Sequence, residues 1–159
     1  MAVFPDDDLF TPTLTEEDDV VGFERPWNPW SLVVLSFFFG ISGGGALLAL
    51  NFSRLGTPRK VLPAVFAVIA VTLLITATRG WGYASLDDAG QLRLLRFADR
   101  AMETGVAGAL AWMQRRRYRV FRGSSAEPGK LLLPGLLAAV LSVVIQLALS
   151  TLFESLFQR

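Results

Sequence analysis

Ser42 is the residue of this 159-residue chain whose neighbours come nearest to a catalytic motif, because glycines flank it in the run Gly40-Ile-Ser-Gly43. A serine hydroxyl is a weak nucleophile unless a neighbouring base takes its proton. The sequence contains no histidine and no cysteine, which excludes a Ser-His triad, a thiol nucleophile, a disulfide framework and a zinc finger. We therefore predict a non-enzymatic protein, with no catalytic residue, no metal and no cofactor.

Three polar side chains near the C-terminus, Ser142, Gln146 and Ser150, follow one another at intervals of four residues. This spacing places them on one face of a helix. In an apolar helix such a stripe hydrogen-bonds to a neighbouring helix, at about 0.6 kcal/mol per bond, and the alternative is a polar path for a solute. The expected spans carry none of the charged residues on which coupled transporters depend. Helix packing is therefore the preferred interpretation, and transport by this chain alone is not expected.

The elements that must hold these residues are three runs without a charged residue, at residues 31–50, 61–78 and 131–153. A helix of about 20 apolar residues crosses the hydrocarbon core of a bilayer, which is about 30 Å thick. Three such helices in so short a chain leave little amphipathic material to cover them in water. The sequence predicts an all-α fold, an integral membrane helical bundle with three transmembrane helices.

The first of these runs is rich in glycine. Gly40 and Gly44 form a G-x-x-x-G pair, and Gly43 lies beside them. Small residues at this spacing let a second helix approach closely. We predict that these glycines pack against a helix of the same chain, or alternatively against a second copy or another membrane subunit.

The segment between the second and third runs differs in kind. Residues 91 to about 118 predict one helix, on which Arg93, Arg96 and Arg100 share a face. Its uncharged part, 104–113, is too short to cross a bilayer alone. The preferred prediction is an amphipathic helix lying in the membrane interface. The alternative is a partial or complete fourth span.

Basic residues flank the expected spans and predict contacts with lipid headgroups. These residues are Arg54, Arg59, Lys60, Arg115, Arg116, Arg117 and Arg119. Membrane lipids are therefore the expected counter-ions, and no nucleic acid is expected as a partner. With three spans, eleven basic residues fall on the side of the N-terminus and four on the other, which predicts a cytoplasmic N-terminus. A fourth span would reverse that orientation.

An acidic segment precedes the first run. Residues 1–25 hold eight acidic residues and one basic residue, whereas the rest of the chain holds six acidic and fourteen basic residues. The acidic residues of the 1–25 segment alternate with apolar side chains, and this pattern is typical of segments that become ordered when they bind a basic partner. The expected partner-binding residues are Phe4, Asp7, Asp8, Leu9, Phe10, Glu16, Glu17, Asp18 and Asp19. The partner is another protein or the chain's own Arg-rich segment, and the alternative is a solvated, disordered tail.

The stretch from Gly43 to Gly56, a glycine-rich span followed by an N-x-x-R-L-G loop, resembles a broad set of small bacterial membrane proteins. The aromatic and basic stretch from Gln114 to Phe121 is a second point of similarity. The resemblance implies a bacterial multi-helix membrane module, and hence a place in the bacterial plasma (inner) membrane. It implies no catalytic residue.

The expected organisation has four parts. They are an acidic tail at 1–30, a transmembrane hairpin at 31–78, an Arg-rich amphipathic helix and loop at 79–130, and a C-terminal transmembrane helix at 131–159. The preferred function is that of an accessory or scaffold subunit, which packs with other membrane helices or with copies of itself and docks a partner through its tail. The alternatives are a small oligomeric channel or transporter component and, last, a membrane enzyme acting on lipid headgroups.

Overall fold

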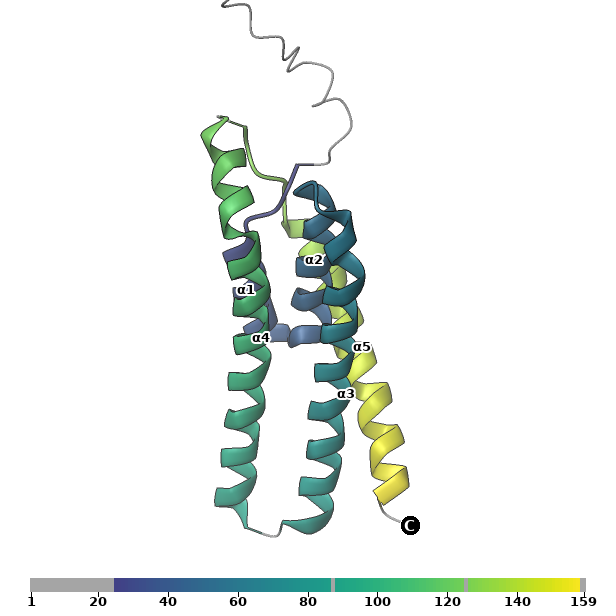
Figure 1. Cartoon of the computed structure of the whole chain (residues 1–159). Coiled ribbons are helices and arrows are strands. Elements are labelled where there is room, and N and C mark those ends of the chain that lie inside the picture. Colours follow the sequence, from purple (N-terminus) through teal and green to yellow (C-terminus); the bar gives the residue numbers. More distant parts are fainter. Residues whose placement is uncertain (1–24, 87, 125, 158–159) are drawn as a thin grey trace, which may run out of the picture.

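The computed structural model describes residues 25–157 apart from residues 87 and 125. Within that range every regular element is a helix, so the all-α prediction is confirmed. The elements are α1 (Pro29–Phe39), α2 (Ile41–Arg54), the short 3-10 helix η1 (Pro58–Lys60), α3 (Val61–Ser85), α4 (Ala89–Gly123) and α5 (Leu132–Phe157). The long helices α3, α4 and α5 run in alternating directions along the molecule (Figure 1).

Gly40 divides the first apolar run into two helices, so the prediction of a single span over 31–50 is wrong. Its backbone has φ +88° and ψ 163°, a conformation open in practice only to glycine. The chain then folds back on itself, since the Trp27 amide before α1 donates to Asn51 Oδ1 at the end of α2, at 2.8 Å. Together α1 and α2 form a hairpin that fills only the upper half of the bundle (Figure 1). We call this element the half-height hairpin.

A tight turn joins α2 to α3 and makes these two helices antiparallel. Gly56 has φ +67°, and the backbone around it donates back into the last turn of α2, from Leu55 to Asn51 O and from Thr57 to Phe52 O. Pro58 then begins η1, which leads directly into α3. Gly56 and Pro58 therefore separate α2 from α3, as a glycine after a helix and a proline at the start of the next one commonly do.

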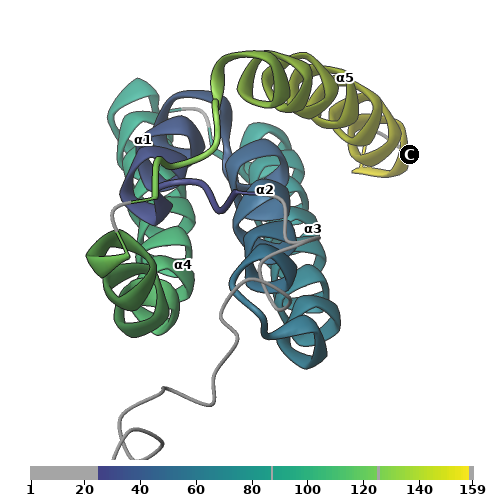
Figure 2. The ribbon, with the colours of Figure 1, turned by 90° about the horizontal axis from the view of Figure 1, so that it is seen from above.

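Asp88 caps the N-terminus of helix α4, and its carboxylate accepts hydrogen bonds from the amides of Gly90 and Gln91. It runs back along α1, α2 and α3, as both views of the ribbon show (Figures 1 and 2). The preferred prediction of a helix lying flat across the membrane surface does not fit this arrangement. The physical reason is that α4 buries the polar side chains Asp99, Glu103 and Gln114 against the other helices.

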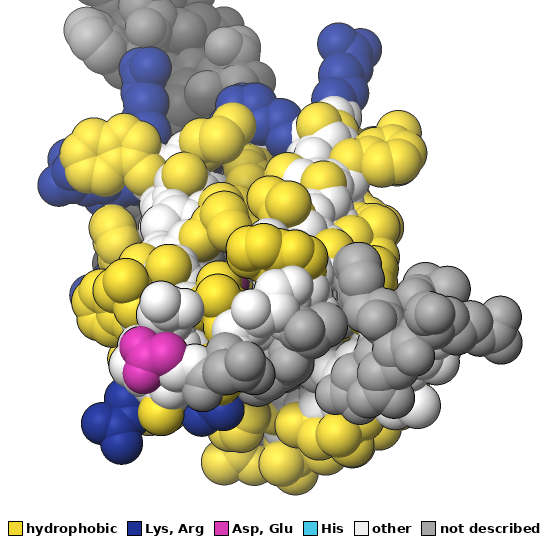
Figure 3. Space-filling model, turned by 90° about the horizontal axis from the view of Figure 1, so that it is seen from below, with side chains coloured by type: hydrophobic (Ala, Val, Ile, Leu, Met, Phe, Trp, Pro, Cys, Tyr) yellow, Lys and Arg dark blue, Asp and Glu magenta, His cyan; other side chains and the backbone are white. Residues whose placement is uncertain are grey.

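The core centres on α2, which contacts α1, α3, α4 and α5. Its members include Leu48 and Phe52 of α2, Leu32 of α1 and Ala111 of α4. The outer surface is also apolar. In the most apolar stretch of α3 only 22% of the residues are buried, and in the most apolar stretch of α5 only 17% are buried. Seen from below, hydrophobic side chains cover much of the surface and Lys and Arg stand at its margin (Figure 3).

Two helical stretches of the described chain, Pro58–Gly82 and Leu132–Phe153, are long and apolar enough to cross a membrane. These coincide with the second and third runs found in the sequence. The structure thus shows an all-helical bundle with two candidate membrane spans.

Candidate functional site

The tip of the half-height hairpin leaves the last carbonyls of α1 without helical partners, and side chains from two other helices bind them. Ser142 Oγ and Gln146 Nε2 of α5 donate to Phe39 O, at 2.5 Å and 3.2 Å. On the opposite side Arg100 Nη1 of α4 donates to Phe37 O at 3.3 Å. The hairpin tip is therefore held between α4 and α5.

The α5 side of the tip is a small hydroxyl cluster. Ser42 lies at the start of α2, with its Oγ 2.6 Å from Ser142 Oγ. Because Ser142 donates its single proton to Phe39 O, Ser42 is the donor in this pair. Ser150 lies two turns beyond Ser142 on α5 and is half-buried. The structure thus brings Ser142 and Gln146 together at the hairpin tip.

The α4 side of the tip holds four charged groups, which we call the charged cluster. Arg79 Nε of α3 lies 2.7 Å from Asp99 Oδ2, and Arg79 Nη2 lies 3.6 Å from Glu103 Oε1. Arg100 Nη1 lies 2.9 Å from Glu103 Oε2. The side chains of Asp99 and Glu103 are each only 3% exposed. Opposite charges thus offset one another around two buried carboxylates.

The sequence did not predict the charged cluster, because the Arg-rich helix was placed outside the bundle. The signal was nevertheless present. Asp99, Glu103, Ala107 and Ala111 recur at intervals of four residues and are all buried. The small residues Ala107 and Ala111 of this series are typical of a face that packs closely against another helix.

The glycines of α2 approach different neighbours within the chain. A Cβ on Gly43 would lie 2.7 Å from Ala138 O of α5, and one on Gly44 would collide with Ser36 and lie 2.8 Å from Leu32 O of α1. Gly40 is the break itself and does not share a helix face with Gly44. The structure therefore places these three positions at contacts with α1 and α5.

A buried amide network fixes the chain that enters α1. Asn51 Nδ2 donates to Trp27 O at 3.0 Å and to Gln114 Oε1 at 2.7 Å. Gln114 Nε2 in turn donates to Leu48 O at 2.7 Å, and Trp27 Nε1 donates to Lys130 O at 3.3 Å. In the sequence, Asn51 belongs to the N-x-x-R-L-G loop pattern and Gln114 to an aromatic and basic stretch. Their pairing across 63 residues had no local signal.

The predicted lipid-headgroup residues gather at the end of the bundle where α1 begins. This basic end carries Arg54, Arg59 and Lys60 from the α2–α3 turn together with Arg115, Arg116, Arg117 and Arg119 from α4. The three-span prediction had placed these two groups on opposite sides, and that assignment does not fit the structure. The reason is that α4 returns the chain to the end at which α2 finishes.

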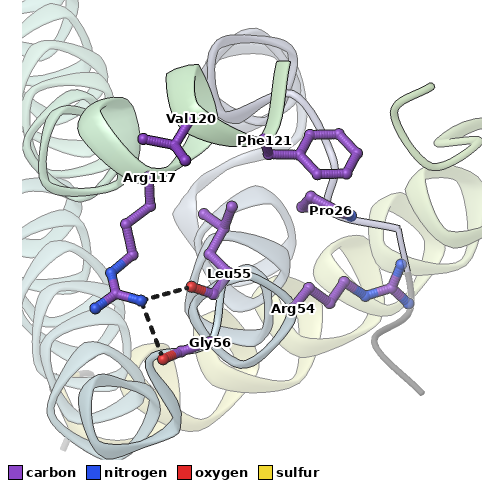
Figure 4. A pocket seen from close by; sticks show the side chains of 7 residues that line it. All are labelled: Pro26, Arg54, Leu55, Gly56, Arg117, Val120 and Phe121. Atoms are coloured by element: carbon purple, nitrogen blue, oxygen red, sulfur yellow. Dashed lines mark hydrogen bonds between the residues drawn. The ribbon is translucent and has the colours of Figure 1, made fainter. Parts of the chain in front are cut away.

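A cavity of about 420 Å³ opens at the basic end, between the turn after α2 and the last turns of α4 (Figure 4). Arg117 Nη1 donates to Leu55 O and Gly56 O, both at 3.3 Å. The guanidinium of Arg54 lies 3.6 Å from the centre of the Trp27 ring. Arg117 therefore holds the turn after α2, and Arg54 holds the chain that enters α1. Both also add positive charge to the basic end.

The described residues contain no group of three or more acidic side chains that could hold a metal ion. The nine tail residues predicted to bind a partner, from Phe4 to Asp19, lie outside the part of the chain that the structure describes.

The fold and its interior define a helical bundle with an apolar exterior, a broken helix and a charged cluster inside. No family model, curated protein or solved structure matches this chain. Its function is therefore inferred from geometry.

Proposed function

We propose that the chain is an integral membrane protein that crosses the bilayer with α3, α4 and α5, while the half-height hairpin enters and leaves from one side. The observation that supports this proposal is the exposure of apolar surface. Val140, Val144 and Leu147 of α5 are each more than half exposed, whereas the described polar and charged interior groups lie between helices. A surface of this kind needs lipid around it.

The spacing of the charges fits this arrangement. Lys60 and Arg79 are 19 residues apart on α3, about 28 Å at 1.5 Å per residue. On α4 the nearest charged residues on either side of the uncharged part, Glu103 and Arg115, are 12 residues apart, about 18 Å. The interval on α3 matches a hydrocarbon core of about 30 Å, whereas that on α4 is shorter. The short uncharged part of α4 is compatible with crossing because its N-terminal charged flank bonds to α3 and α1, and Arg117 of its C-terminal flank bonds to the turn after α2.

The distribution of basic residues supports a cytoplasmic basic end. In the described chain that end carries ten basic residues, namely Arg25, Arg54, Arg59, Lys60, Arg115, Arg116, Arg117, Arg119, Arg122 and Lys130. The other end carries four, namely Arg79, Arg93, Arg96 and Arg100. The positive-inside rule then puts the N-terminus in the cytoplasm and the C-terminal end of α5 on the far side of a bacterial plasma membrane.

Within the membrane we propose a non-enzymatic accessory or scaffold role, with the acidic tail as the docking segment. Residues 1–24 contain eight acidic residues and no basic residue, and they join the bundle at Arg25 of the basic end. Inside the described bundle, the glycines of α2 meet neighbours in the same chain. The tail is therefore the segment best suited to a soluble partner.

A co-purification experiment tests the docking role. The full chain, a variant lacking residues 1–24 and a variant with the eight tail acids replaced by Asn or Gln are purified from membranes after cross-linking. We expect one set of co-purifying proteins with the full chain and its loss in both variants. The same set in all three preparations would contradict the docking role.

A second function, as a small channel or transporter component, is favoured by one observation. The chain breaks at Gly40, inside the bundle, beside Arg100 on one side and Gln146 on the other. Ion and substrate sites in transporters are formed at such broken helices. Ion or solute flux into liposomes that disappears in Arg100→Gln and Gln146→Leu would support this function. Absence of flux in the wild-type protein would contradict it.

A further inference from the structure

The cavity of about 420 Å³ at the basic end has an apolar wall on α4. Val120 and Phe121 form this wall, and the Phe121 ring points toward Pro26 (Figure 4). Val120 is 73% exposed and comes five residues after Arg115, about 8 Å further along the helix. In the orientation proposed above, the wall therefore lies on the cytoplasmic side of Arg115. Apolar surface that is exposed to water is typical of docking sites.

Positive charge lies on the same face of α4. Arg116 and Val120 are four residues apart, as are Arg117 and Phe121, and this interval puts each arginine beside an apolar residue of the wall. Arg116 is exposed. Arg117 lines the cavity and donates from Nη1 to the turn after α2. The cavity thus offers an apolar surface with a basic edge.

Few acidic residues balance this charge within the described chain. The basic end carries ten basic residues there, and Glu127 is its only acidic residue. The Glu127 carboxylate lies 3.6 Å from Arg25 Nη1. Neither Arg116 nor Arg117 forms an ion pair with another described residue. The described part of this end therefore has a net charge of +9, which favours an acidic partner.

Residues 1–24 carry the opposite charge and join the bundle beside the cavity. They contain eight acidic residues and no basic residue, so their net charge is −8. They continue through Arg25 into Pro26, which lines the cavity. An extended chain spans about 3.3–3.6 Å per residue, so Asp19, six residues before Arg25, reaches about 20 Å from it. That reach is ample for the wall at 116–121, which is about 8 Å long.

The order of residues before Arg25 matches the order of surfaces around the cavity. Counting back from Arg25, apolar residues come first, at 20, 21 and 23, and four consecutive acidic residues follow at 16–19. In Figure 4 the Phe121 ring lies toward Pro26, whereas Arg117 is on the far side of the cavity, at the turn after α2. A segment that leaves Pro26 therefore meets the apolar wall before it meets the arginines.

We propose that residues 16–23 dock on the basic end of the same molecule. Phe23 occupies the cavity, and the acidic residues at 16–19 bind the two arginines beside the apolar wall. The inference rests on the docking role proposed above, and it adds a site that holds the nearest part of the segment when no partner is bound. Residues 6–10 then remain for the soluble partner. Attachment at Arg25 favours this occupant over a separate chain, because it keeps the segment at a high local concentration.

The distance between two spin labels in the full-length protein, measured by pulsed electron paramagnetic resonance, tests the proposal. The chain has no native cysteine, so Thr15→Cys and Ser53→Cys give one label beside the acidic residues and one at an exposed position of the basic end. We expect a narrow distance distribution in detergent and in phosphatidylcholine nanodiscs, because docking fixes residue 15 relative to α2. High salt should broaden the distribution, since salt screens exposed charges.

Two matched pairs of substitutions test the segment. Neutralising the acidic residues at 16–19, with Gln for Glu and Asn for Asp, should abolish the narrow distance, whereas Asn for Asp at 6–8 should preserve it. Phe23→Ser should likewise broaden the distribution, and Phe4→Ser should not. Both controls remove the same kind of side chain from outside the proposed docking residues.

A third pair tests the bundle. Arg116→Gln removes charge beside the apolar wall and should broaden the distance distribution. Arg122→Gln is its control, because residue 122 is exposed and lies two positions from Val120, on the opposite side of α4. Docking through these contacts is contradicted if each variant and its control behave alike.

Three other results would also overturn the proposal. A broad distribution in the wild-type protein would exclude docking. The same narrow distance in a mixture of singly labelled molecules would assign the segment to a second copy. Loss of the narrow distance in phosphatidylglycerol nanodiscs would assign the arginines to anionic lipid. Because the measurement uses purified protein without a partner, a negative result alongside intact co-purification would leave the proposed docking role standing.

Discussion

At Gly44 a hydrogen atom in place of a side chain determines how closely α2 approaches α1. We predict that Gly44→Ala destabilises the protein by about 1–3 kcal/mol or more, because the added Cβ would press on the backbone of Leu32 and Ser36. Gly108→Ala is the control, with no atom near the new Cβ and a better helix former in place of glycine. Thermal unfolding in detergent should show a large drop in Tm for the first variant only. Equal Tm values would mean that the two helices do not pack as described.

The charged cluster makes a second prediction at the residue scale. Arg79→Gln should destabilise the bundle by about 3–5 kcal/mol, since it leaves Asp99 and Glu103 buried with less opposite charge. The double variant Arg79→Gln/Asp99→Asn should recover part of that loss, because it removes the carboxylate that Arg79 binds most closely. Arg93→Gln is the exposed control. If urea or thermal unfolding shows that the double variant loses as much stability as Arg79→Gln and Asp99→Asn lose together as single variants, the pairing of Arg79 with Asp99 is contradicted.

Residue types could be predicted from the sequence better than their partners. The absence of histidine and cysteine and the positions of the basic flanks are visible in the chain itself. The contacts of Asn51 with Gln114 and of Arg79 with Asp99 join residues far apart in sequence. Such pairs form only when two particular helices lie side by side, and no local pattern in the sequence indicates which helices these are.

At the scale of elements, the break at Gly40 is the feature that the sequence did not predict. Length and apolar composition favoured one span over 31–50, because those properties do not register a single residue with φ +88°. The spacing of Gly40 and Gly44 predicts a packing face on one continuous helix. Helix α4 was likewise placed outside the bundle, since its uncharged part is short and the pairing of its flanks depends on α3.

Gly40→Ala tests the hairpin at this scale. A side chain in this backbone conformation costs of order 1–3 kcal/mol, and the new Cβ also meets Gln146. The double variant Gly40→Ala/Gln146→Ala removes the collision and keeps the backbone strain, so it should remain less stable than Gln146→Ala alone. Full recovery of Tm in the double variant would show that Gly40 serves only to make room for Gln146.

At the scale of the whole molecule, the exposed apolar side chains of α3 and α5 support the proposed membrane environment. Two long apolar runs in the sequence form most of α3 and α5, because an uncharged apolar run of 18 residues or more is typical of a helix. The sequence of those runs does not indicate which face of each helix packs inward, because apolar side chains lie on every face of both helices.

A single charge on the outer face tests this environment. Val140 of α5 is 58% exposed and lies ten residues from Lys130, which is about 15 Å into the membrane in the proposed arrangement. Val140→Lys should reduce membrane integration by about 2.5–3.5 kcal/mol. Val120→Lys, at an exposed position of the basic end, should have no effect. Equal integration of the two variants in an alkaline-extraction assay would contradict a lipid-facing α5.

The arrangement of the half-height hairpin and of α4 is the central claim, and single-cysteine labelling tests it most directly because the chain has no native cysteine. The variants are Arg25→Cys, Ser53→Cys, Ser85→Cys and Ser124→Cys, all at exposed positions. They are treated with a membrane-impermeant maleimide in sealed vesicles of known orientation. We expect residues 25, 53 and 124 to label from one side and residue 85 from the other. Labelling of residues 25 and 53 from opposite sides, or of residues 85 and 124 from the same side, would contradict the account.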